Sequence, residues 1–161
     1  MPKIIADTSC IQYLYQTDLL SLLPILYNEI ILPQTVVDEL AIGIASGVSL
    51  PNIVSISWIA VRKAINREIL PQVTELGSGE EEAISLALEI PDSLVILDDA
   101  LGRRCARQMG VKFTGTLGVL LKAKQAGHLT AVAPVLDQLD ALRFRLDAST
   151  RAAVLKLAGE L

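Results

Sequence analysis

Short apolar runs alternate along the chain with longer segments in which apolar residues recur every three or four positions. The short runs are rich in Ile, Val and Leu, which is typical of strands buried on both faces of a parallel sheet. The pattern predicts an α/β fold, with a mostly parallel central sheet flanked by helices. The predicted strands are Lys3–Ala6, Ile30–Leu32, Ile53–Ile56, Leu94–Leu97 and Val111–Phe113. The predicted helices are Ser9–Leu26, with a break near Pro24, Gln34–Ile44, Trp58–Ile69, Gly79–Ile90, Ala100–Met109 and Thr116–Ala126, followed by two more between residues 134 and 161.

The length of 161 residues and the hydrophobic share of 52% fit one domain with a sizeable core, residues 1–161, on which residues 134–161 pack. Cys10 and Cys105 are too few for a disulfide framework, so we expect reduced core residues and a cytoplasmic protein. Residues 40–61 carry no charge, but Gly43, Gly47 and Pro51 interrupt them. We therefore expect no membrane-spanning helix there.

The charge balance limits how this chain could bind nucleic acid. It holds 14 Lys and Arg against 18 Asp and Glu, for a net charge of −4. A protein that binds long duplex DNA by charge alone is usually more basic. Aromatic residues make up only 4%, which argues against a base-stacking platform. Any nucleic acid is therefore expected to be held locally, through metal ions.

Two acids follow predicted strands. Asp7 ends the first strand and Asp98 ends a later one. Ligands of open α/β sheets bind at the carboxyl ends of the strands, so these two carboxylates could share one metal site. The alternative is that each caps the helix that follows it, a common role for Asp.

A third acid is placed by helical spacing. Glu80 precedes an apolar stripe by three, four, seven and eight positions, so it should face the sheet. Ser78 and Glu81 have the spacing of a capping box, which gives Glu81 a structural role. Glu82 shares its side of the helix with Glu89, and we expect both in solvent.

Glu39 is a fourth candidate, at the edge of the apolar stripe of its helix. In the same helix Thr35 and Asp38 have the spacing of a cap. Four carboxylates with few basic neighbours in sequence suit hard cations such as Mg²⁺ or Mn²⁺. Such a site would support in-line attack of an activated water on a phosphodiester.

Five segments in this order resemble the PIN-domain family, and specifically an uncharacterised bacterial subfamily related to VapC-type toxins. The resemblance covers essentially the whole chain. The segments are Asp7-Thr8-Ser9, Pro33 with Val36-Val37-Asp38-Glu39-Leu40, Gly79-Glu80-Glu81-Glu82-Ala83-Ile84, Leu97-Asp98-Asp99 with Gly102-Arg103-Arg104, and Thr114-Gly115-Thr116-Leu117-Gly118-Val119-Leu120.

The resemblance implies a three-layer PIN-like fold and a metal-dependent endoribonuclease, often the toxin of a toxin–antitoxin pair. It also implies an RNA substrate, an Mg²⁺ or Mn²⁺ cofactor, a small antitoxin partner and a homodimer. By position, the first three acids are Asp7, Glu39 and Glu80. The fourth falls on Asp98 or Asp99, with Asp98 favoured as catalytic and Asp99 as supporting. The implied metal ligands are Asp7, Glu80, Asp98 and Asp99, and the implied orienting hydroxyls are Thr8 and Thr116.

The sequence departs from the better-known toxins at two points. The third acid is Glu80, where they usually have Asp, and Asp98-Asp99 precedes arginines rather than a single Asp preceding an aromatic residue. Arg103 follows the strand-end acids and could contact a substrate phosphate or an acidic antitoxin segment. The alternative is that it belongs to a solvated basic face.

The sequence also bears on three further interpretations. A phosphatase-like site is disfavoured because Ser9 stands where a phosphatase has its second Asp. A receiver-like site is disfavoured because the acid pair Asp98-Asp99 lies late in the chain and not on the first strand. A PIN-like module that binds protein or RNA without cutting is the alternative to the nuclease. Apolar residues 19–26 exceed what one helix face needs, which indicates either a homodimer seam or a helix pair buried within the domain.

Overall fold

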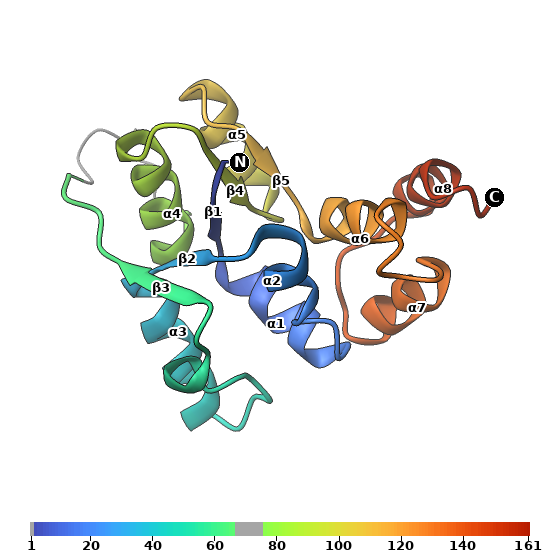
Figure 1. Cartoon of the computed structure of the whole chain (residues 1–161), viewed down its shortest axis with the longest axis horizontal. Coiled ribbons are helices and arrows are strands. Elements are labelled where there is room, and N and C mark those ends of the chain that lie inside the picture. Colours follow the sequence, from blue (N-terminus) through green and yellow to red (C-terminus); the bar gives the residue numbers. More distant parts are fainter. Residues whose placement is uncertain (1, 67–75) are drawn as a thin grey trace.

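The computed structural model describes residues 2–66 and 76–161. Within them, five strands form one sheet in the order β3-β2-β1-β4-β5, and every neighbouring pair is parallel (Figure 1). The expected parallel α/β sheet is therefore confirmed. The strands are β1 (Lys3–Ala6), β2 (Ile30–Pro33), β3 (Ile59–Arg62), β4 (Ser93–Ile96) and β5 (Phe113–Thr114).

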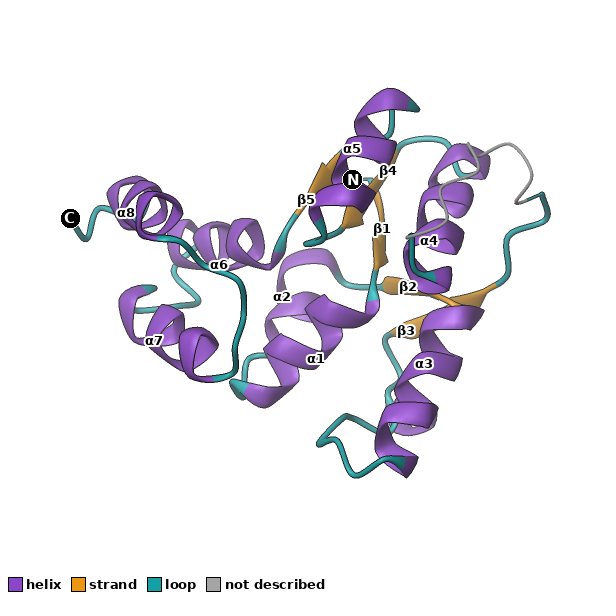
Figure 2. Ribbon diagram, turned by 180° about the vertical axis from the view of Figure 1, so that it is seen from behind, coloured by secondary structure: helices purple, strands orange, loops and turns teal. Residues whose placement is uncertain are grey.

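Helices cover both faces of this sheet (Figure 2). Helices α4 and α5 pack on one face, and α1, α2 and α6 pack on the other. Helices α7 and α8 lie beside α6, at the end of the molecule farthest from β3 (Figure 1). The helices are α1 (Thr8–Gln16), α2 (Leu22–Tyr27), α3 (Gln34–Ala45), α4 (Ser78–Glu89), α5 (Ala100–Gln108), α6 (Thr116–Gln125), α7 (Ala133–Ala141) and α8 (Ala148–Leu157), with a 3-10 turn η1 (Ile53–Ser55).

The three layers explain why the strands are apolar without alternation. Successive side chains of a strand point to opposite faces. Ile4 and Ala6 of β1 enter the core beneath α1 and α6, whereas Ile5 enters the core beneath α4 and α5. Helices cover both faces of the sheet, so the side chains on both faces must be apolar.

The strand order predicts a ligand-binding position at the carboxyl ends of β1 and β4. The chain builds β1, β2 and β3 outward on one side and then returns to add β4 and β5 on the other. This reversal is where open α/β sheets bind ligands. Ala6 pairs with Ile96, so Asp7 and Asp98 leave adjacent strands at nearly the same level. The sheet therefore brings these two acids to one edge.

The predictions for residues 53–69 are wrong. Residues 53–56, expected as a strand, contain the 3-10 turn η1, and the strand lies later, at Ile59–Arg62. We expected a helix over Trp58–Ile69, but Ile59–Arg62 pairs in parallel with Ile30–Pro33, and residues 67–69 lie outside the described part of the chain. Pairing with β2 therefore decided the conformation, and strand preference depends on such packing.

The first long helix breaks earlier than expected. Helix α1 ends at Gln16 and α2 begins at Leu22, with Asp18 at a positive φ of 60° between them. Pro24 falls in the first turn of α2, where a missing N–H costs little, so it does not break the helix. Leu22 and Leu23 are buried in the protomer's own core, which favours the intradomain interpretation of the apolar residues 19–26.

The C-terminal helices contribute to the same core as α1 and α6, through Leu136, Leu139, Phe144 and Val154. Glu160 fixes the start of α7, because its carboxylate accepts hydrogen bonds from the Val132 and Ala133 N–H groups and pairs with Lys124 at 2.7 Å. The Lys124 ammonium and these two N–H groups lower the pKa of Glu160 to about 2.

Cys10 and Cys105 are both buried and free, as expected. In the described ranges, every helix falls short of the length and apolar character that a bilayer crossing requires.

Candidate active site

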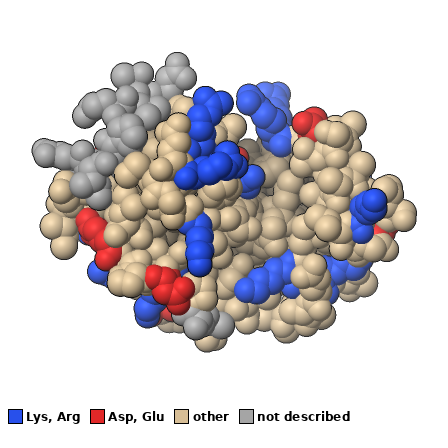
Figure 3. Space-filling view, turned by 90° about the horizontal axis from the view of Figure 1, so that it is seen from above, with Lys and Arg blue, Asp and Glu red and all other residues tan. Residues whose placement is uncertain are grey.

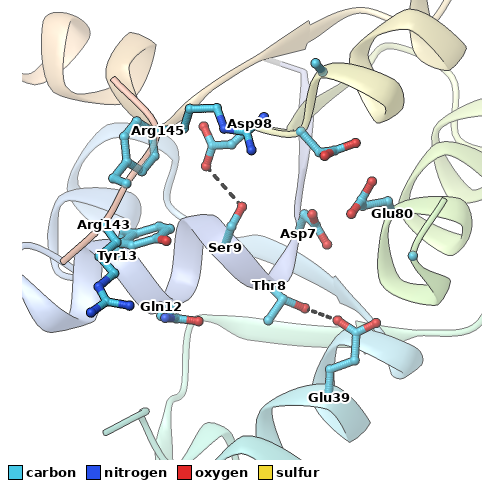
Figure 4. A pocket seen from close by; sticks show the side chains of 14 residues that line it. Asp7, Thr8, Ser9, Gln12, Tyr13, Glu39, Glu80, Asp98, Arg143 and Arg145 are labelled. Carbon is cyan, nitrogen blue, oxygen red and sulfur yellow. Dashed lines mark hydrogen bonds between the residues drawn. The ribbon is translucent and has the colours of Figure 1, made fainter. Parts of the chain in front are cut away.

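A cavity of about 510 Å³ opens at the carboxyl ends of β1 and β4. Five acids from separate parts of the chain line it, and Figure 4 shows Asp7 and Glu80 facing one another within it. All the acids predicted as catalytic or metal-binding are among them. These five are Asp7, Glu39, Glu80, Asp98 and Asp99.

Asp7 is the most enclosed of these acids, with 4% of its surface exposed. It occupies the N-cap position of α1, but its side chain makes no capping hydrogen bond to that helix. Burial raises the pKa of Asp7 to about 7, against the opposing effect of the Thr8 N–H. The carboxylates of Glu39, Asp98 and Asp99 add to the rise. Asp7 is therefore a carboxylate whose charge is costly unless a cation compensates it.

Glu80 points inward from the first turn of α4, as its helical spacing predicted. Its Oε2 atom is buried and has no hydrogen-bond partner among the residues that the structure describes. Burial raises the pKa of Glu80 to about 8, and the charges of Asp7 and Asp99 act in the same direction. A buried acceptor left without a partner indicates a ligand site or a bound proton.

Asp98 is held from two elements. Its Oδ1 accepts the Thr116 N–H at 2.7 Å, and its Oδ2 accepts hydroxyl hydrogen bonds from Thr116 at 2.7 Å and Ser9 at 3.1 Å. Asp98 therefore caps α6 and not the helix that follows it. The Gly115 backbone lies so close that an added Cβ would come within 2.9 Å of Asp98 Oδ1. A glycine at this position is what lets the carboxylate reach the start of α6.

Glu39 and Asp99 are also anchored through backbone groups. Glu39 accepts the Thr8 hydroxyl on Oε2 and the Gly79 N–H on Oε1, the latter at 2.9 Å. A Cβ at Gly79 would lie 2.9 Å from Glu39 Oε2, so a larger residue there would displace this carboxylate from its position. Asp99 is the N-cap of α5 and accepts the Gly102 N–H at 2.9 Å. Helix starts thus orient three of the acids.

The prediction that Glu82 lies in solvent is wrong. Glu82 is 3% exposed, and its carboxylate accepts hydrogen bonds from the Thr35 N–H, the Thr35 hydroxyl and the Ala64 N–H. The segment after β3 covers this side of α4, and Glu89 accepts the Ile65 and Asn66 N–H groups there.

The two predicted helix caps, at Ser78 and at Thr35, are also wrong. The N-cap of α4 is Gly77, which leaves Ser78 inside the helix and rules out a capping box. The N-cap of α3 is Pro33, so Thr35 lies inside that helix as well. The Thr35 hydroxyl donates to the Ser78 carbonyl and to Glu82, which joins α3 to α4.

Replacing Glu82 with Ala should therefore destabilise the fold. The change leaves three donors without their acceptor, which costs about 2–3 kcal/mol. We expect the thermal unfolding midpoint to fall by roughly 5–10 °C. Glu82→Gln keeps one acceptor oxygen and should lose less than half as much. Equal midpoints for Glu82→Ala and the wild type would contradict this structural role.

Arg103 is not among the residues that line the cavity. Its Nε donates to the Leu97 carbonyl at 2.7 Å, and its guanidinium lies 5.5 Å from the centre of the Phe113 ring. An added Cβ at Gly115 would lie 2.0 Å from Arg103 Nη2 and 2.9 Å from Asp98 Oδ1, so the side chain braces the end of β4 close to Asp98 but outside the cavity. The phosphate or antitoxin contact stays a prediction.

Three site residues were missed in the sequence. Ser9 supports Asp98, and Arg143 and Arg145 line the cavity from the loop between α7 and α8 (Figure 4). Ser9 follows directly on the Asp7-Thr8 pair, which was a local signal. The two arginines flank an aromatic residue between two predicted helices, but nothing local indicates that this loop reaches the strand ends.

Basic side chains are unevenly spread over the surface. On the face drawn in Figure 3, Lys and Arg gather near the middle and around a hollow, whereas Asp and Glu lie nearer the edge. A net charge of −4 therefore does not prevent local attraction of an anion.

The donor set fits a hard divalent cation. The cavity offers carboxylate oxygens, and within residues 2–66 and 76–161 none of its five acids forms an ion pair with Lys or Arg. No three His, Cys, Asp or Glu groups in those residues are placed to ligate one ion together. Mg²⁺ usually takes one or two protein carboxylates and keeps several waters, so Asp7 and Glu80 suffice.

Comparison with known proteins agrees with this architecture. The family model DUF3368, described as a PIN domain, matches residues 3–160. A solved structure, a PilT N-terminus domain protein, SSO1118, from the hyperthermophilic archaeon Sulfolobus solfataricus P2, has a similar fold, with a TM-score of 0.54 and 21% identity over 74% of this chain and 92% of that one. No curated protein matches this sequence significantly.

Proposed function

The chain belongs to the PIN-domain family, a nuclease-type fold, and from that premise we propose that it is a metal-dependent endoribonuclease that hydrolyses phosphodiester bonds in RNA. One observation supports this proposal above the others. Acids from both strand ends and two helices converge on one cavity, and a buried oxygen of Glu80 has no partner there within residues 2–66 and 76–161. Charged carboxylates that lie this close together without a cationic partner destabilise the fold unless a metal ion binds them.

We assign the cation to Asp7 and Glu80, with Mg²⁺ or Mn²⁺ as the candidates. Asp98 and Asp99, which the resemblance also implies as ligands, line the same cavity. Since no three acids of the described residues are placed to hold one ion together, these two would contact it through its waters. Oxygen ligands favour these hard ions over softer metals. When bound, such an ion polarises the phosphodiester and lowers the pKa of water. Asp7 and Glu80 titrate near neutral pH without metal, so cation binding should release protons from them.

The remaining side chains position the acids. The Thr116 and Ser9 hydroxyls donate to Oδ2 of Asp98, and the Thr116 N–H donates to its Oδ1. The Thr8 hydroxyl donates to one oxygen of Glu39. Outer hydroxyls of this kind hold ligands in one orientation. Glu39 accepts hydrogen bonds from the first residue of α1 and from Gly79 of α4, so we give it an orienting or proton-accepting part.

A toxin role with a small acidic antitoxin, and a homodimer, also remain part of the proposal. Their support is the resemblance to VapC-type proteins. Exposed apolar side chains near the end of α3, Ile42 at 67% and Ile44 at 46%, offer a surface for a second chain.

Replacing Glu80 with Gln should reduce RNA cleavage about 10–100-fold, because it removes one charged ligand from the proposed site. The measurement is cleavage of a labelled RNA with Mg²⁺, with Mn²⁺ and with EDTA. Glu81→Gln is the matched control, since Glu81 is the next residue of α4 and does not line the cavity. We expect the wild type and Glu81→Gln to cut with metal only.

Two results would overturn the proposal. Cleavage that persists in EDTA would contradict the metal. A wild type that is folded, free of bound protein and unable to cut any RNA would favour the binding module instead.

A further inference from the structure

The loop between α7 and α8 brings two arginines to the cavity from a distant part of the chain. Arg143 and Arg145 line it together with the acids. Figure 4 shows them on the side opposite Glu80 and Glu39, with Asp7 between the two groups and Asp98 on the side of Arg145. The cavity therefore carries acids along its length and both of its arginines at one end.

The loop is fixed by an aromatic anchor between the arginines. Phe144 is 9% exposed, and its ring packs edge-on against Tyr13 at 5.0 Å between centroids. Its N–H donates to the Leu139 carbonyl at 2.9 Å. Because Phe144 is held, the residues on either side project outward, and both arginines are exposed.

Arg143 occupies a backbone position that favours glycine. Its φ is 66°, and its N–H donates to the Asp140 carbonyl, while the next N–H reaches Leu139. These two bonds form the helix-ending motif in which the left-handed residue is usually glycine. A side chain that strains the backbone tends to persist where the surrounding structure uses it, often at a functional site.

Neither guanidinium makes a side-chain hydrogen bond or an ion pair with another described residue. Each offers five N–H donors in a planar fork that matches phosphate. The cavity volume of about 510 Å³ suits roughly one or two nucleotides of a single strand and is too small for a duplex.

We propose that Arg143 and Arg145 hold the backbone phosphate of single-stranded RNA next to the phosphate that lies at the acids. This inference rests on the proposed nuclease function, and it adds the element that binds the substrate. An acidic protein segment is the competing ligand. RNA is favoured because, with the proposed cation bound at the acids, both parts of the cavity attract an anion, and neighbouring phosphates of one strand can occupy both.

Binding is tested without cleavage, in Asp7→Asn protein with Mg²⁺ and a fluorescein-labelled single-stranded RNA. Adding Arg143→Gln and Arg145→Gln should weaken binding about 10-fold and reduce the slope of log affinity against log salt by about 0.7 for each lost phosphate contact. The matched control adds Arg62→Gln and Arg104→Gln, which change the charge equally at exposed residues outside the cavity. We expect less than about a 3-fold effect there.

Each outcome of the binding experiment either supports or overturns the proposal. Equal losses for both pairs would overturn the proposal in favour of general charge attraction, as would no loss for either. Unchanged RNA binding with weaker binding of polyglutamate would assign the arginines to an acidic protein. Failure of the wild type to cleave RNA would overturn the nuclease while leaving a site-specific loss of RNA binding intact.

Arg143→Gly separates ligand binding from a structural role. It removes the guanidinium but suits the positive φ, so the thermal midpoint should stay level or rise. In the cleavage assay we expect KM to rise about 5-fold with kcat within about 2-fold, since the contact is made in both ground and transition states. A fall in both the midpoint and kcat would mean that the side chain supports the fold instead.

Discussion

Asp7→Asn is expected to abolish RNA cleavage and at the same time to stabilise the metal-free protein. Asp7 is 4% exposed. Burial and, to a smaller extent, the charges of the nearby carboxylates raise its pKa to about 7. Above that pH the folded protein must hold a buried charge that the unfolded chain solvates freely. Asparagine has nearly the same shape and no charge, so the cost disappears.

The expected loss of cleavage exceeds about 100-fold, because the change removes a direct ligand and not an outer partner. At pH 8 without metal, the midpoint should rise by about 3 °C or more. Asp38→Asn is the control, since Asp38 is exposed and does not line the cavity. Wild-type cleavage by Asp7→Asn, or a lower midpoint, would contradict the assignment.

Divalent metal should stabilise the protein far more at pH 8 than at pH 5.5. The ordinary pKa values of 3.8 for Asp7 and 4.5 for Glu80 rise to about 7 and about 8 in the fold. Between these limits the folded state holds more protons than the unfolded state, so stability falls as pH increases. The loss of stability is complete only when the pH exceeds the pKa values of both acids in the folded state. At that pH both carboxylates are charged, so a bound cation stabilises the fold most.

The measurement is thermal unfolding in EDTA, Mg²⁺ and Mn²⁺ across this range. In EDTA the midpoint should fall by about 5 °C from pH 5.5 to pH 8, and metal should restore it. The double variant Asp7→Asn, Glu80→Gln should show neither the pH slope nor the metal effect. A metal effect of equal size at both pH values would mean that the cation binds elsewhere.

The two predictions describe one trade-off. The fold places acids where they repel one another, because the strand ends and helix starts that deliver them are set by the sheet. Such arrangements reduce stability and persist where function needs them. Asp98, Asp99 and Glu39 avoid part of this cost through hydrogen bonds from backbone N–H groups.

Much of the site followed from local patterns. Continuous apolar runs indicate strands covered on both faces, and an acid directly after such a run must lie at a strand end, which located Asp7 and Asp98. The helical period placed Glu80 toward the sheet, because neighbours three and four residues away share its face.

Local patterns gave wrong predictions where contact with a segment far away in sequence determines the structure. The same helical period placed Glu82 in solvent, but the segment after β3 covers that side of α4 and makes Glu82 a buried acceptor. Ile59–Arg62 became a strand because β2 offered an open edge. Spacing along a helix defines its faces, but it does not say what packs on them.

The sequence by itself therefore determined a parallel sheet, apart from its strand β3, and three of the acids, since periodicity and strand-end position are properties of a short stretch of chain. Only the tertiary structure decided the partners of those acids and the basic side of the cavity. Arg143 and Arg145 line the same cavity as Asp7 because Phe144 anchors their loop on Tyr13, a contact between residues far apart in the chain. Contacts of that kind depend on how whole elements pack, and no local spacing encodes them.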